Sequence, residues 1–108
     1  MIRRELAQRF DELLLAYGPS LARLAASYAR GASEHDDLFQ EIALAIWRAL
    51  PSFRGDCSER TFVFRIAHNR GISCLARRVV ANVNAYRSSI QMLAADAASV
   101  TYRYPAAT

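Results

Sequence analysis

The segment from Asp36 to Leu50 constrains the fold most, because its apolar residues fall on one side of a helix. At roughly 100° per residue these residues cover a single arc, and they are Leu38, Phe39, Ile42, Ala43, Ile46 and Leu50. Pro51 ends the pattern, since a proline disfavours helical geometry in the residue before it. We therefore predict an amphipathic helix here, which must bury its apolar arc against other parts of the chain.

The composition predicts that those other parts are also helices. Ala, Leu and Arg fill 45 of the 108 positions, whereas Gly and Pro together fill seven, and strong helix formers at this density favour an all-α fold. A chain of this length buries somewhat more than about 60% of its unfolded surface, enough for a core without disulfide or metal staples. We expect one compact bundle of three to four helices.

Apolar spacing also places the other elements. A first helix is predicted from Arg4 to Tyr17, with a kink or short break at residues 18–20 because of Pro19, and a continuation to Arg30 that Gly31 caps. Ser33 is the predicted cap of the next helix.

A basic, aromatic loop is predicted over residues 51–60, followed by a helix from about Ser58 to Arg78, which an Asp-x-Ser sequence could cap. Beyond it the apolar pattern fades, with a weak helix around residues 88–98 and an extended tail at 102–105. The predicted domains are a helical domain over 1–78 and a linker or weakly helical segment over 79–108.

Charge is unevenly distributed along the chain. Residues 1–50 hold six Arg against seven acids, and residues 51–108 hold eight Arg against three acids. This asymmetry suggests two surfaces with different partners, although a solvated basic face is the alternative.

The cysteines and the apolar runs indicate the compartment. The two cysteines lie outside a CxxC pattern, which indicates reduced thiols, and no apolar run approaches the ~20 residues of a membrane span. We expect a cytoplasmic protein without membrane insertion.

The polar side of the 36–50 helix is a candidate binding face. A lone Leu44 lies among polar residues on that arc, where it would be an apolar anchor for a partner. The alternative is a solvated face with one exposed leucine, which is common on protein surfaces.

The loop and the helix after it suggest a second candidate face. Aromatic residues beside Arg and Asn are what single-stranded nucleic acid needs, because rings stack on bases, charges attract phosphates and an amide reads base edges. Phe62 and Phe64 are also compatible with a purely structural role in the core.

An enzymatic function is a remote alternative, in which His35, Asp37 and Glu41 would hold a divalent metal ion. No motif indicates catalysis, a metal or another cofactor.

Four segments in order resemble the second conserved region of the bacterial sigma-70 family, in its extracytoplasmic-function (ECF) group. They are Asp36-Asp37-Leu38-Phe39-Gln40-Glu41, Ile46-Trp47-Arg48-Ala49-Leu50, Phe53-Arg54-Gly55-Asp56 and Arg65-Ile66-Ala67-His68-Asn69. The resemblance covers roughly residues 10–78. It implies a non-enzymatic helical domain that binds core RNA polymerase and recognises and melts the promoter −10 element in transcription initiation.

The resemblance also implies roles for individual residues. The residues expected to bind the clamp coiled coil of the largest polymerase subunit are Asp37, Gln40, Glu41, Leu44 and Arg48. Those expected to bind the non-template DNA strand are Phe53, Arg54, Arg60, Phe64, Arg65, Ile66, Asn69, Arg70, Arg77 and Arg78. An anti-sigma factor is a further candidate partner.

Some positions depart from the family pattern, namely Ala45, Phe62, His68, Gly71 and Ser73, so promoter preference does not transfer. The resemblance implies that complete family members continue into a helix-turn-helix that reads the −35 element, and we expect no such domain between Arg78 and residue 108. The chain is then either a piece of a longer sigma factor or a one-domain relative. The alternative function is a module that binds polymerase or an anti-sigma factor without productive promoter recognition.

Overall fold

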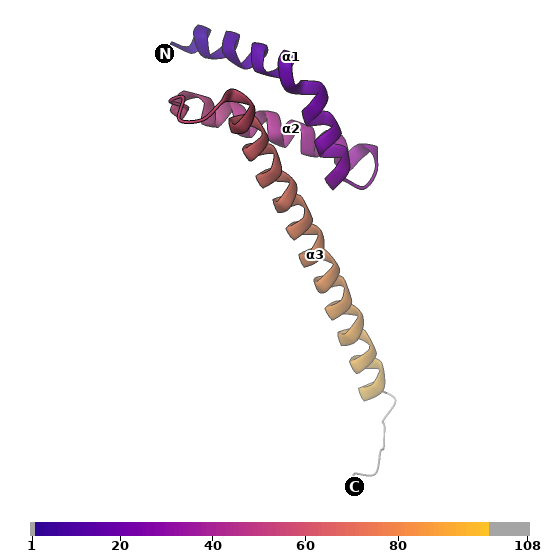
Figure 1. Ribbon diagram of the computed structural model, residues 1–108. Coiled ribbons are helices and arrows are strands. Elements are labelled where there is room, and N and C mark those ends of the chain that lie inside the picture. The colour runs from indigo at the N-terminus through magenta and orange to yellow at the C-terminus, as the bar shows by residue number, and fades with distance from the viewer. Residues whose placement is uncertain (1, 100–108) are drawn as a thin grey trace. The chain divides into compact units, whose positions relative to one another are not determined.

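A computed structural model describes residues 2–99, and within them the chain forms three α-helices and one short 3-10 helix (Figure 1). The order is α1 (Arg3–Tyr28), α2 (Ala32–Ala49), the 3-10 helix η1 (Leu50–Ser52) and α3 (Glu59–Ser99). The predicted all-α fold is confirmed. The predicted tail at 102–105 lies outside the described residues.

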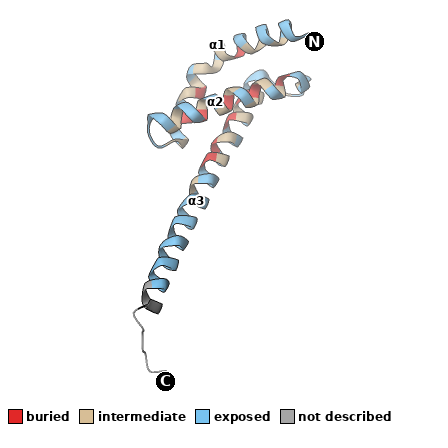
Figure 2. Ribbon diagram, turned by 180° about the vertical axis from the view of Figure 1, so that it is seen from behind, coloured by how far each residue is buried: buried red, intermediate tan, exposed pale blue. Residues whose placement is uncertain are grey.

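The chain divides into two units, Met1–Leu75 and Ala76–Thr108. The first contains α1, α2, η1 and the beginning of α3. Its buried residues come from all of these elements (Figure 2), and they are Leu13, Leu21, Ala25, Leu38, Ile42, Ile46, Leu50, Val63, Ala67 and Cys74. The predicted apolar arc of α2 therefore faces the core, where each large side chain contributes about 1.5–3 kcal/mol on burial.

Pro19 lies inside α1 rather than at a break. A proline cannot donate a hydrogen bond to the carbonyl one turn earlier, and Figure 1 shows α1 bent along its length. Of the predicted alternatives, a kink fits the structure and a break does not. The helix continues because Leu13 before the proline and Leu21 and Ala25 after it are all buried, so core packing on both sides offsets the lost hydrogen bond.

The predicted caps between α1 and α2 are wrong. Ala29 ends α1, and Gly31 is the residue that precedes α2, with a φ of 87° that suits glycine. Ser33 lies in the first turn of α2, which begins four residues earlier than predicted. The Glu34 carboxylate in that turn accepts a hydrogen bond from the Arg30 backbone N–H at 2.9 Å, so a side chain inside α2 holds the connection.

His35 joins the beginning of α2 to α1. Its Nε2 lies 2.9 Å from the Ala22 carbonyl oxygen and its Nδ1 lies 3.2 Å from Asp36 Oδ1. The hydrogen bond to the Ala22 carbonyl, with help from Asp36, raises the pKa of His35, because both acceptors favour the ring with two N–H donors.

Helix α3 begins as predicted and ends much later. The Ser58 Oγ accepts a hydrogen bond from the Thr61 backbone N–H at 3.1 Å, which is the capping arrangement expected of a serine before a helix. The helix then continues to Ser99, so its predicted end near Arg78 is wrong. The weak helix predicted at 88–98 is the last part of α3.

Gly71 permits a close approach between α1 and α3. A Cβ built on this buried glycine would lie 2.7 Å from Cγ of the Tyr28 ring. The Tyr28 hydroxyl is 3.0 Å from Nδ1 of His68, so the ring is tied to α3 one turn before the glycine. Although Gly costs a helix about 1 kcal/mol relative to Ala, its missing side chain is what lets the tyrosine pack here.

We expect Gly71→Ala to lower the free energy of unfolding by about 1–3 kcal/mol, because the clash exceeds the gain in helix propensity. Urea unfolding of the chain measures this. The matched control is Gly18→Ala in α1, where a Cβ would meet nothing within 4 Å, and which should be neutral or slightly stabilising. If the two variants behave alike, the tyrosine does not need the glycine.

Candidate functional site

The outer side of α2 carries four of the five residues predicted to bind polymerase. Asp37, Gln40, Leu44 and Arg48 are exposed, while Leu38, Ile42 and Ile46 on the other side of the helix are buried. Leu44 keeps 46% of its surface exposed. The predicted apolar residue within a polar face is therefore present on the surface.

Glu41 is the exception, because it is half-buried and paired with α3. Its Oε1 lies 3.6 Å from Nη1 of Arg70, with the two side chains 31% and 39% exposed. Glu41 is therefore the one residue of the five that also takes part in packing between helices. Through this pair Arg70 links α3 to α2, a role that the sequence did not indicate.

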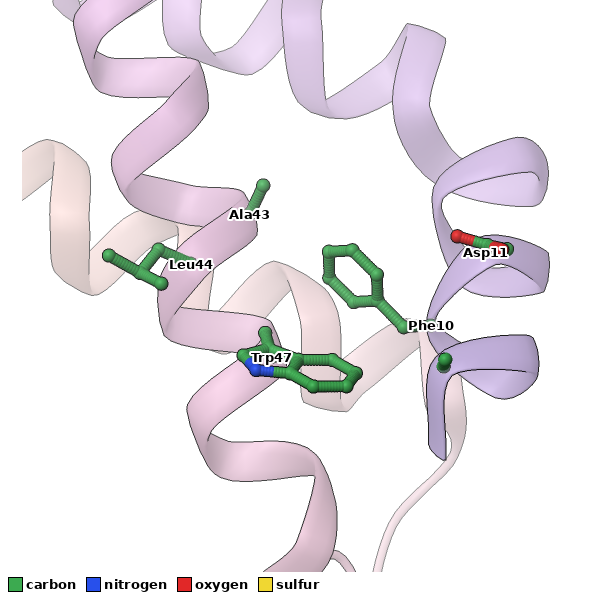
Figure 3. A pocket seen from close by; sticks show the side chains of 6 residues that line it. Phe10, Asp11, Ala43, Leu44 and Trp47 are labelled. Atoms are coloured by element: carbon green, nitrogen blue, oxygen red, sulfur yellow. The ribbon is translucent and has the colours of Figure 1, made fainter. Parts of the chain in front are cut away.

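A hollow lies beside Leu44 (Figure 3), and the sequence did not indicate it. It holds about 440 Å³ between α1 and α2, and its lining is Ala7, Phe10, Asp11, Ala43, Leu44 and Trp47. The rings of Phe10 and Trp47 meet edge to face at 5.3 Å between centroids. No spacing pattern in either helix alone indicates that the rings of Phe10 and Trp47 meet beside an open hollow.

The loop at residues 53–58 is anchored by stacked aromatic rings. Phe53 stacks on Phe62 at 4.4 Å between centroids and 29° between ring planes, and both are half-buried. The Arg9 guanidinium lies 5.5 Å from the Phe53 ring and 3.1 Å from the Glu59 carboxylate. Phe53 thus packs within the protein, while its neighbour Arg54 is exposed.

A second hollow lies along one flank of α3. It holds about 540 Å³ and is lined by Arg60, Thr61, Phe64, Arg65 and His68. The Arg60 guanidinium lies 4.9 Å from the Phe64 ring, which meets Tyr17 of α1 edge to face at 6.3 Å. Cationic and aromatic groups are together here, as binding of a nucleic acid base and phosphate requires.

The predicted DNA-binding residues do not form one cluster. Arg60, Phe64 and Arg65 share the second hollow, Asn69 is exposed without lining it, and Ile66 is half-buried against the core. Arg77 is exposed and Arg78 is half-buried, and both belong to the unit after Leu75. A residue list taken from motifs therefore mixes surface groups with groups that hold the fold together.

Within residues 2–99 no three His, Cys, Asp or Glu side chains come together in a way that would hold a metal ion. No helix there is long and apolar enough to cross a membrane.

Comparison with known families matches residues 13–88 to the sigma-70 region 2 model. The chain belongs to the sigma-70 region 2 family. The resemblance to the ECF group on the four motifs is thereby confirmed at the level of the family. All four motifs lie within the matched residues of this region 2 domain.

Three curated relatives illustrate the similarity. The region 2 domain is 34% identical over 77 residues to RNA polymerase sigma-H factor of Pseudomonas aeruginosa, covering 71% of this chain and 40% of the relative. It is 36% identical over 61 residues to RNA polymerase sigma factor NccH of Alcaligenes xylosoxydans xylosoxydans, covering 56% and 33%. RNA polymerase sigma factor CnrH of Cupriavidus metallidurans is 34% identical over 61 residues, covering 56% and 32%.

The chain spans less than half the length of each of these relatives. No solved structure was found that matches it.

We expect Glu41→Arg to destabilise the region 2 domain by about 1 kcal/mol or less, since it places two guanidinium groups together at a half-exposed position. The second substitution Arg70→Glu in the same chain restores opposite charges and should recover most of the loss. Thermal unfolding of the two single variants and the double variant gives the coupling between the sites. Additive losses would mean that the two side chains do not interact.

Proposed function

We propose that this region 2 domain acts as part of an RNA polymerase sigma factor, binding core polymerase through the outer side of α2. Family membership supports the general role. The observation that carries the assignment of the surface is Leu44, an exposed leucine beside the hollow of Phe10 and Trp47. In protein interfaces, a few apolar side chains beside a hollow and surrounded by polar residues contribute most of the binding free energy. Leu44 has such surroundings.

The partner on this surface is the clamp coiled coil of the largest polymerase subunit. Asp37, Gln40 and Arg48 give the rim its polar groups, and Asp11 adds a carboxylate at the hollow. Glu41 contributes indirectly, by holding α2 against α3 through Arg70. An anti-sigma factor that competes with polymerase would use the same surface.

We propose that α3 and the loop before it bind the non-template strand of the promoter −10 element and help to melt it. Arg54, Arg65 and Asn69 are exposed and available to DNA. The hollow that Arg60 and Phe64 line has the size and chemistry for an extruded base, and its contacts must offset the few kcal/mol that flipping costs. Phe53, Ile66 and Arg70 complete the proposed DNA-binding set, and each also packs within the domain, as the half-buried Phe64 does.

The half-burial of those three residues also favours the second candidate function, a module that binds polymerase without recognising a promoter sequence. Binding of polymerase and promoter DNA makes the cytoplasm the expected compartment.

We expect Leu44→Arg to weaken binding to core RNA polymerase at least tenfold, while the melting temperature stays within about a degree, because the side chain is already exposed. Biolayer interferometry with immobilised core polymerase measures the affinity. The matched control is Leu15→Arg, an exposed leucine on α1, which should bind like the unchanged chain. Equal affinity of both variants would contradict the assigned surface.

We expect the combined change Arg54→Ala and Asn69→Ala to abolish the preference for a −10 single strand over a scrambled strand. Both side chains are exposed, so the fold should survive. Fluorescence anisotropy at two salt concentrations separates sequence preference from charge attraction. The control Arg23→Ala removes an arginine that contacts Ser20 within α1. Equal, weak binding of both strands to the unchanged chain would favour the module without promoter recognition.

A further inference from the structure

The part of α3 in the second unit exposes a continuous apolar stripe. The stripe residues are Ala76, Val79, Val83, Tyr86, Ile90 and Leu93, and the five larger ones keep between 47% and 70% of their surface exposed. The steps between neighbours are three, four, three, four and three residues. We call these six residues the seam. The expectation that the apolar pattern fades after Arg78 is wrong, because the pattern persists at this spacing.

Alternation of three and four residues has a specific structural meaning. The average spacing between apolar residues is then 3.5, which keeps the stripe facing one neighbouring helix over its whole length. A helix that packs onto a globular surface does not need such a strict repeat. The seam places Val83 and Ile90 at equivalent positions seven residues apart. A second helix with the same repeat is therefore the partner whose shape fits.

The seam also needs a cover for energetic reasons. Helices in proteins owe most of their stability to packing of an apolar face, and the residues around the seam include weak helix formers such as Asn82, Asn84 and Ser88. The five larger seam residues are exposed, so residues 76–99 do not cover the seam themselves. A single exposed helix of this composition would be marginal in water.

The residues flanking the seam favour an identical partner. Coiled coils that select a different partner do so with charges beside the seam. Here the flanking residues are Val80, Asn82, Arg87, Ser89 and Ala94, so only one is charged. A second copy of the chain supplies a seam of equal length and spacing. Because the flanking residues carry only one charge, pairing two copies does not place rows of like charges opposite each other.

The surface available agrees with a weak pairing. At about 100 Å² of exposed apolar surface for each seam residue, two copies together would bury on the order of 1,200 Å², the lower limit of stable interfaces. Such an area suits a weak, reversible complex. We propose that the chain forms a homodimer in which the seams of two copies pair as a two-stranded coiled coil.

Sedimentation equilibrium of the full chain from about 1 to 200 µM tests the proposal. The mass should rise from the 12.1 kDa of one chain towards twice that value, and far-ultraviolet circular dichroism should show helix content rising over the same range. The seam variant, with Val83→Glu and Ile90→Glu, should remain monomeric and keep the lower helix content.

The matched control carries Ala85→Glu and Met92→Glu, two exposed residues on the far side of the helix from the seam. It has the same charge and spacing as the seam variant and should dimerise like the unchanged chain. A monomeric mass for the unchanged chain at 200 µM would overturn the proposal. Dimerisation of the seam variant as strong as that of the control would overturn it as well.

Discussion

The burial of one side of α2 determines the rest of the region 2 domain. Leu38, Ile42 and Ile46 are almost completely removed from solvent, in one cluster with residues of α1 and α3. Since a helix has a fixed period, burying these three residues forces Gln40 and Leu44 outward. The candidate polymerase surface is thus a direct consequence of the core.

The same reasoning applies to α3, where the core decides which predicted DNA contacts remain available. Val63 and Ala67 are buried, so Arg65 and Asn69 must lie on the surface. Specific contacts around the core then join the helices and hold the loop between them. Gly71 lets the Tyr28 ring approach α3, Glu41 and Arg70 link α2 to α3, and the stack of Phe53 on Phe62 holds the loop between them.

The sequence predicted the parts of the structure that depend on local pattern. The arc of α2, the exposure of Leu44 and the serine cap of α3 all follow from spacing and residue type. Errors arose where packing overrides local preference, as at Pro19, where burial on both sides keeps α1 continuous. At Gly31 the glycine begins a helix instead of ending one, since a positive φ serves either connection.

Contacts between residues distant in the chain could not be predicted from one sequence. The pairing of Glu41 with Arg70, and the meeting of Phe10 with Trp47, depend on how three helices pack, which spacing within each helix does not specify. The length of α3 was missed for another reason. Apart from Ala76 and Leu93, its seam consists of β-branched and aromatic residues among Ser and Asn, which lowers its apparent helix propensity although the repeat is regular.

We propose that one small domain presents separate surfaces to polymerase and to the −10 strand, so both should bind together. The most direct test is anisotropy of a labelled −10 non-template strand titrated with this chain in the presence and absence of saturating core RNA polymerase. The account predicts a three-component complex in which the strand binds more tightly, and more selectively, than to either protein alone. Displacement of the strand by polymerase, or no complex with polymerase at all, would contradict it.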